Sequence, residues 1–92
     1  MSQPLFDPYI YRALREVARG EISRHRATAE LWHRDQVMPP RCADALLGLY
    51  DGGYIHWCDD VPGGLLRADL TRAGAQLLAS WLSVPRDQAT AA

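Results

Sequence analysis

The 92-residue chain has no lysine, only two cysteines and no long apolar run. All ten basic residues are arginines, and with eleven acidic residues the formal net charge is −1, which gives no general attraction to nucleic acid or anionic membranes. No stretch approaches the roughly 20 apolar residues that span a bilayer, and the first residues lack the pattern of a signal peptide. We therefore expect a cytoplasmic protein with no membrane partner.

The two cysteines, Cys42 and Cys58, each lie in an apolar run. A small secreted domain would be expected to carry more cysteines, in pairs, so their scarcity favours the reducing interior of a cell. His56 and Cys58 are two residues apart on an expected strand and would point the same way, but no second pair has metal-ligand spacing. We predict no metal and no cofactor.

Recognisable catalytic motifs are also missing. The chain has no glycine-rich phosphate loop, no nucleophile with a neighbouring base and no carboxylate pair at a familiar spacing. We predict that it is not an enzyme. Its length allows one domain with a single core, which we place at residues 8–82, between a flexible lead-in at 1–7 and a flexible tail at 83–92.

Helix signals open the domain. Asp7 followed by Pro8 provides a side-chain acceptor at the N-cap and a residue suited to the first helical position. Ile10 and Leu14 begin an apolar stripe at helical spacing, and Gly20 stops the helix. The sequence predicts a first helix between these two signals.

Two further helices are expected before the middle of the chain. Thr28 is a candidate N-cap for a second helix over residues 29–33, while residues 21–23 fit either a short extended piece or the run-in to that helix. A third helix is predicted over about 40–50, and the glycine pair at 52–53 supplies the backbone conformation that ends it.

A β-hairpin and a last helix follow. Residues 54–57 have strand composition, residues 59–64 are rich in turn-forming types, and residues 65–70 form the returning strand. Thr71 is the predicted N-cap of the last helix, which carries a wide apolar stripe.

This order resembles the winged helix-turn-helix pattern of MarR-type and PadR-type bacterial regulators. The resemblance covers roughly residues 28 to 82 and rests on two segments. The first is Glu30-Leu31, then Val37, Ala43 and Leu46-Leu47, leading into Leu49-Tyr50-Asp51-Gly52-Gly53-Tyr54-Ile55, and the second is Leu70-Thr71-Arg72-Ala73-Gly74-Ala75-Gln76-Leu77-Leu78. It implies an α+β fold, a winged helix-turn-helix with a three-helix core, a two-stranded β wing and a C-terminal helix. It also implies a small DNA-binding protein, a transcriptional or phage-type regulator.

The charges leave a second interpretation open. From Arg12 to Arg41 seven arginines stand against four acidic residues, whereas from Asp44 to Asp69 one arginine stands against five. An acidic wing repels a phosphate backbone, and phosphate contacts dominate affinity for nucleic acid. The alternative is therefore a winged-helix adaptor that binds a protein through its acidic wing and third helix. For double-stranded DNA, the candidate contact residues are Arg24, Arg26, Thr28, Arg34, Arg41 and Arg67.

Self-association is the last expectation. In the families that the chain resembles, the first and last helices form dimers, and the last helix here is more apolar than a small monomer needs. We expect a homodimer whose interface is formed by Ile10, Leu14, Leu77, Leu78, Trp81 and Leu82.

Overall fold

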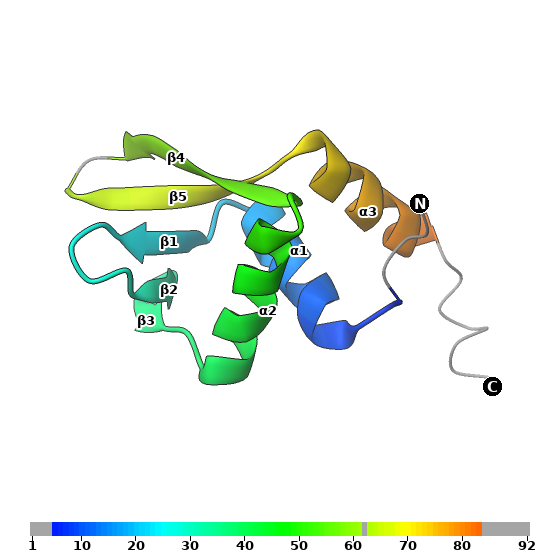
Figure 1. The fold of residues 1–92 in the computed structure, drawn as a ribbon, viewed down its shortest axis with the longest axis horizontal. Coiled ribbons are helices and arrows are strands. Elements are labelled where there is room, and N and C mark those ends of the chain that lie inside the picture. Colours follow the sequence, from blue (N-terminus) through cyan, green and yellow to red (C-terminus); the bar gives the residue numbers. More distant parts are fainter. Residues whose placement is uncertain (1–4, 62, 84–92) are drawn as a thin grey trace.

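The computed structural model describes residues 5–61 and 63–83, and these form an α+β arrangement of three helices and one five-stranded antiparallel sheet (Figure 1). The helices are α1 (Pro8–Ala18), α2 (Pro40–Asp51) and α3 (Arg72–Ser83). The strands are β1 (Ile22–His25), β2 (Leu31–His33), β3 (Gln36–Val37), β4 (Ile55–Val61) and β5 (Leu65–Leu70), in the spatial order β3-β2-β1-β5-β4. None of the helices in the described ranges is long and apolar enough to cross a membrane.

The first helix begins where the sequence predicts. The Asp7 carboxylate accepts hydrogen bonds from the backbone N–H groups of Tyr9 and Ile10, at 2.8 and 3.4 Å. Pro8 occupies the first turn, where its missing N–H costs nothing. Gly20, with φ of +73°, then turns the chain into β1, so the extended alternative for residues 21–23 is the correct one.

The second helix expected from Thr28 is wrong. Residues 26–29 instead form a turn, and residues 31–33 form β2, which pairs antiparallel with both β1 and β3. The Thr28 hydroxyl accepts the N–H of Glu30 at 3.3 Å within the turn, and Ala29 has φ of +60°, which an α-helix does not contain. Among the described residues there is therefore no helix-turn-helix pair before α2.

Side-chain alternation explains why this segment is a strand. Leu31 is buried in the core, whereas the following Trp32 is half-buried on the opposite face of the sheet. A period of two with an aromatic residue is the strand pattern, and burial of Leu31 outweighs a local N-cap signal. Arg34, with φ of +58°, then turns the chain from β2 into β3.

The third helix, the hairpin and the last helix are confirmed as α2, the pair β4–β5 and α3. Gly53, with φ of +81°, makes the turn from α2 into β4. Thr71 caps α3, since its hydroxyl accepts the N–H of Gly74 at 3.2 Å and donates to the carbonyl of Gly53 at 2.6 Å. This pair of bonds fixes the start of α3 against the end of α2.

The two faces of the sheet differ. On the helix face, Ile22, Ile55 and Ala68 are almost fully buried against side chains from all three helices. The other face, here called the open face, has half-buried or exposed side chains. Register places one row of it across all five strands: Val37, Trp32, Ser23, Arg67 and Cys58.

Candidate functional site

Helix α2 and the β4–β5 hairpin form the surface on which the functional expectation rests, and Figure 1 shows them side by side at the end of α2. Leu46 and Leu49 hold α2 in the core. Its outer side carries apolar and acidic side chains as well as Arg41. The apolar ones are Leu47 and Tyr50, which are 41% and 45% exposed. We call this outer side, together with the helix-face side chains of the hairpin, the α2–hairpin surface.

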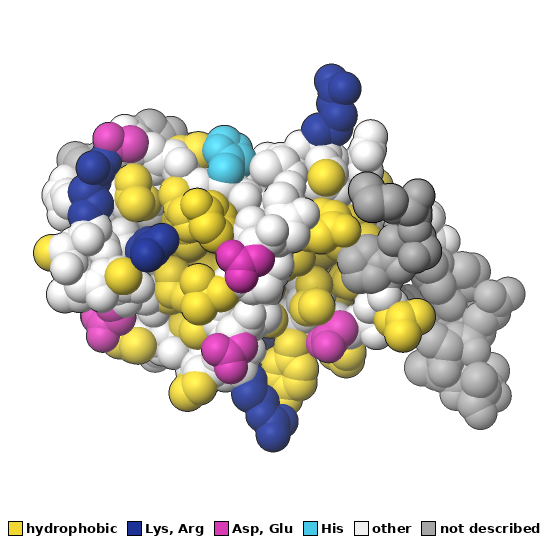
Figure 2. Space-filling model, viewed as in Figure 1, with side chains coloured by type: hydrophobic (Ala, Val, Ile, Leu, Met, Phe, Trp, Pro, Cys, Tyr) yellow, Lys and Arg dark blue, Asp and Glu magenta, His cyan; other side chains and the backbone are white. Residues whose placement is uncertain are grey.

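Trp57 connects the helix to the hairpin. Its ring centroid lies 6.3 Å from that of Tyr50 on α2, and the Arg24 guanidinium stands over the same ring, 5.6 Å from its centre. Figure 2 shows hydrophobic side chains gathered on this face of the molecule, with basic and acidic side chains among and around them. Arg24 thus belongs to the α2–hairpin surface, as a cation over the Trp57 ring.

The hairpin tip is less acidic than its sequence suggests. The backbone N–H of Arg26 donates to the carbonyl of Gly64 at 3.1 Å, which brings the end of β1 to the tip. The Arg26 guanidinium forms an ion pair with Asp59. Because both partners are exposed, the pair adds little stability, but it offsets the charge that would repel a phosphate.

Arg41 lies at the start of α2. Its guanidinium is 3.3 Å from the Tyr9 hydroxyl, to which it donates a hydrogen bond, and 6.0 Å from the centre of the Tyr9 ring. Of the predicted contact residues, Arg24 and Arg26 lie by the hairpin, whereas Arg41 lies at the other end of α2 from Tyr50, against Tyr9 of α1.

The other predicted contact residues lie elsewhere. Thr28 belongs to the β1–β2 turn, and Arg67 lies on the open face, opposite Cys58 in the register. Arg34 is held at the end of α1, where its guanidinium donates to the Glu21 carboxylate at 2.8 Å. Arg34 and Arg67 do not join the α2–hairpin surface, while Thr28 lies in the same turn as Arg26.

A network of charges surrounds Glu21. His33 Nε2 lies 2.8 Å from one Glu21 oxygen and 3.3 Å from the carboxylate of the buried Glu16. The Glu16 carboxylate also accepts a hydrogen bond from Arg12 Nε at 3.4 Å. Hydrogen bonds from Arg34 and His33 lower the pKa of the Glu21 carboxyl to about 2. The hydrogen bond between Arg34 and Glu21 also raises the pKa of Arg34. This network ties the β2–β3 turn to α1 and was not found from the sequence, because its members are far apart along the chain.

The predicted dimer residues lie mostly inside one chain. Leu14, Leu77, Leu78 and Trp81 are buried in the core, Ile10 is half-buried, and Leu82 is 55% exposed. The burial of the first four is explained by contacts within the chain, so the apolar stripe on α3 does not itself indicate a second copy.

The open face of the hairpin holds one further group. His56, Cys58 and Asp69 converge there, on neighbouring strands.

Comparisons of the chain with protein-family models, with curated proteins and with solved structures found no match.

Proposed function

We propose that the chain is a small DNA-binding protein of the winged-helix type, a transcriptional or phage-type regulator, in which the β2–β3 hairpin stands where the second helix would be. Three features support this: α2 precedes a hairpin, the hairpin packs beside it, and β1 extends the hairpin's sheet. In such an arrangement α2 enters the major groove and the hairpin tip meets the backbone.

The observation that carries the proposal is the position of Arg26. Its ion pair with Asp59 places a cation at the hairpin tip, where the sequence alone indicates only acidic residues. Arg24 stands over the Trp57 ring of the hairpin, and Arg41 lies in the first turn of α2, against Tyr9 of α1. We expect a duplex that covers both α2 and the hairpin to meet all three cations, each of which would release counterions from the phosphates that it contacts.

The test is a titration of random-sequence duplex DNA, followed by fluorescence anisotropy at low and moderate salt. Wild type is expected to bind at low salt and to lose affinity steeply as salt rises. Arg26→Ala and Arg41→Ala should each weaken binding and lower the slope of log K against log salt by about 1. Asp59→Asn, which removes a repelling charge at the tip, should strengthen binding.

Arg72→Ala is the matched control, because Arg72 is also exposed but starts α3, at the end of β5 away from the tip. It should leave the affinity unchanged. No binding by wild type at low salt, or equal losses from Arg72→Ala and Arg26→Ala, would contradict DNA binding at this surface.

A second candidate is the protein-binding adaptor. The exposed Leu47 and Tyr50, with Trp57 and its stacked Arg24, favour it, since aromatic and arginine side chains dominate binding energy at protein interfaces. The acidic residues on α2 and at the tip would then face a partner with basic groups. Lack of DNA binding in the titration would leave this candidate as the better explanation of the surface.

A further inference from the structure

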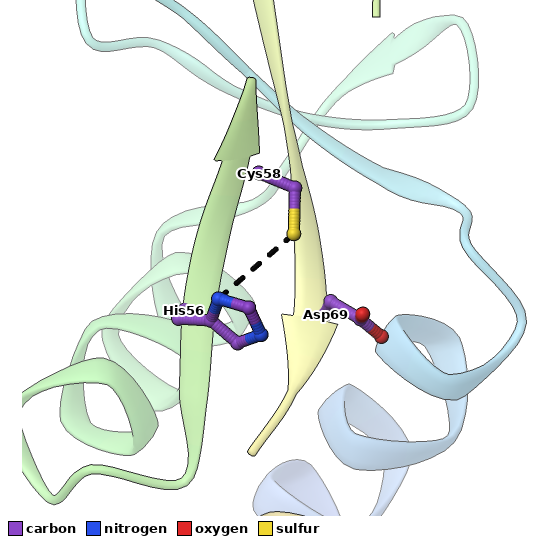
Figure 3. A group of neighbouring side chains, drawn as sticks. All are labelled: His56, Cys58 and Asp69. Carbon is purple, nitrogen blue, oxygen red and sulfur yellow. Dashed lines mark hydrogen bonds between the residues drawn. The ribbon is translucent and has the colours of Figure 1, made fainter. Parts of the chain in front are cut away.

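Three metal-ligating side chains meet on the open face of the β4–β5 hairpin: His56, Cys58 and Asp69 (Figure 3). His56 Nδ1 lies 3.9 Å from Cys58 Sγ, and the ligand atoms of all three residues lie within 4.8 Å of one another. His56 is exposed, while Cys58 and Asp69 are half-buried. The group is therefore open to an ion from solvent.

The strand register creates this convergence. His56 and Cys58 are two apart on β4 and share one face, and Asp69 on β5 stands directly opposite His56. Side chains at directly opposite positions have Cβ atoms only about 5 Å apart. The regular register ends just beyond Cys58, where the pairing shifts between Cys58 and Val61. The three donors thus occupy the last regular part of the ladder before the tip.

The donor set fits zinc. Imidazole nitrogen, thiolate sulfur and carboxylate oxygen are the three types of protein ligand that Zn²⁺ takes. With Zn–S of about 2.3 Å and Zn–N of about 2.0 Å, a tetrahedral ion holds its sulfur and nitrogen ligands about 3.5 Å apart. The 3.9 Å between Sγ and Nδ1 is close to that separation, so these two donors need to move little to bind one ion, and the Asp69 oxygen lies within 4.8 Å of both.

Existing contacts leave these donors available. One Asp69 oxygen accepts the N–H of Leu70 at 3.0 Å, and a carboxylate has further lone pairs for a metal. Within the described residues, Asp69 forms no ion pair. Arg67, opposite Cys58, adds one positive charge to this face, against the two negative charges of a bound thiolate and carboxylate.

The chain has a second cluster of possible ligands, Glu16, Glu21 and His33. The Glu16 and Glu21 carboxylates already form ion pairs with Arg12 and Arg34, and His33 contacts both carboxylates. A metal ion there would have to displace these cations, so this cluster is the weaker candidate and serves as a comparison.

We propose that His56, Cys58 and Asp69 bind one Zn²⁺ ion, with a water molecule as the fourth ligand. The ion would join β4 to β5 on the face opposite Trp57 and stabilise the hairpin. The site rests on the geometry of the hairpin alone and holds whether the α2–hairpin surface binds DNA or protein.

The test uses the full chain, reduced and stripped of metal with a chelator. Zn²⁺ is titrated by calorimetry and in competition with a chromophoric chelator, and Co²⁺ serves as the spectroscopic probe. One ion per chain is expected, with the thiolate-to-metal absorption and ligand-field bands of tetrahedral Co²⁺. Cys58→Ser, His56→Gln and Asp69→Asn should each weaken binding at least about 100-fold, since loss of a second-shell partner alone costs up to that much.

Cys42→Ser and His33→Gln are the matched controls, because they remove the other cysteine and the histidine of the second cluster. Both should bind Zn²⁺ as wild type does. In wild type itself, Zn²⁺ should protect Cys58 but not Cys42 from alkylation, as read by mass spectrometry, so the result does not depend on a variant folding. No stoichiometric binding, unprotected Cys58, or a loss of binding in His33→Gln equal to that in Cys58→Ser would overturn the site.

Discussion

Glu21 joins two parts of the molecule that the sequence keeps apart. It follows the end of α1, and it holds both His33 at the end of β2 and Arg34 in the next turn. Arg34 adopts a left-handed backbone, with φ of +58°, which an arginine rarely takes. The two hydrogen bonds therefore help to hold a turn whose backbone alone would not favour it.

Glu21→Gln is expected to lower the free energy of unfolding at neutral pH. The folded pKa of Glu21, about 2, lies below its ordinary value of 4.5, so folding is favoured by the ionised carboxylate. That contribution is complete above about 4.5 and is lost as pH falls towards 2. Urea unfolding of wild type and Glu21→Gln should thus differ at pH 7, and the difference should shrink below pH 4.5. The effect should be modest and reduced by salt, because Arg34 is largely exposed.

Glu30→Gln is the control for this change. Glu30 is more exposed than Glu21 and accepts a hydrogen bond from the Trp32 indole at 2.8 Å, yet it has no ion pair among the described residues. It should show a smaller dependence on pH. Equal pH profiles for the two variants, or a Glu21→Gln difference that grows in acid, would contradict the role given to Glu21.

At the scale of elements, local sequence signals are enough to predict a helix where capping residues mark its ends. Asp7 and Pro8 predict α1, and Thr71 predicts α3, because the bonds that cap these helices are made by neighbours in the sequence. The two strands of the β4–β5 hairpin were equally readable. What these elements share is that the contacts that define them join residues close in the sequence, at most as far apart as Ile55 and Leu70 in the hairpin.

The error over residues 28–33 has the opposite cause. A strand of three residues is too short to show its period, and its partner strands β1 and β3 are themselves only four and two residues long. A possible N-cap at Thr28 was the only clear local signal. Pairing of Trp32 with Ser23 and Val37 settles the conformation, and such pairing is invisible in composition.

The candidate sites follow the same rule. Arg41 could be placed on α2 from sequence alone, whereas the pairing of Arg26 with Asp59 depends on how β1 docks beside β5. Likewise His56 and Cys58 stand out by spacing, but the third ligand, Asp69, enters only through the register of β4 with β5. Sequence spacing finds donors on one strand and misses the partner across the ladder.

The glycine in the first turn of α3 gives a test at this scale. A Cβ at Gly74 would overlap the Tyr54 carbonyl, because α3 starts tightly against the beginning of β4. Gly74→Ala should therefore destabilise the fold by about 1–3 kcal/mol, the usual cost of overpacking. Thermal and urea unfolding would measure it.

Gly48 is the matched control, since it lies inside α2 and a Cβ there would meet nothing within 4 Å. Gly48→Ala should stabilise the chain by about 0.5–1 kcal/mol, because alanine loses less backbone entropy in a helix. If both substitutions changed stability in the same direction, the close approach of α3 to β4 would not be the cause.

At the scale of the whole molecule, charge is largely balanced by pairing. Arg26, Arg34 and Arg12 each meet a carboxylate, and Arg24 and Arg41 lie against aromatic rings. Such a surface has weak long-range attraction, so a partner must be recognised by close contact rather than by steering. For a protein partner, apolar exposure is then the better guide to where it would bind.

Two exposed leucines mark the two surfaces in question: Leu47 on α2 and Leu82 on α3. The predicted homodimer through α1 and α3 must use Leu82 and its surroundings, because most of the other predicted residues are buried in the core. Phe6, half exposed, adds to this area, since its ring lies 5.2 Å from that of Trp81. A stable interface buries only about 800 Å² on each partner, so a charge in place of one apolar side chain within it should lower the dimer affinity strongly.

Leu82→Glu is therefore expected to weaken dimerisation about tenfold or more, measured by sedimentation equilibrium at micromolar to high micromolar concentrations. Leu47→Glu introduces the same charge at a similarly exposed position on α2 and should leave the dimer intact. A greater effect of Leu47→Glu would place self-association on the α2–hairpin surface, where it would compete with DNA or a protein partner. Sedimentation of wild type as a monomer throughout would contradict the homodimer. Packing within a single chain would then be the whole reason for the apolar character of the four predicted residues that are buried in the core.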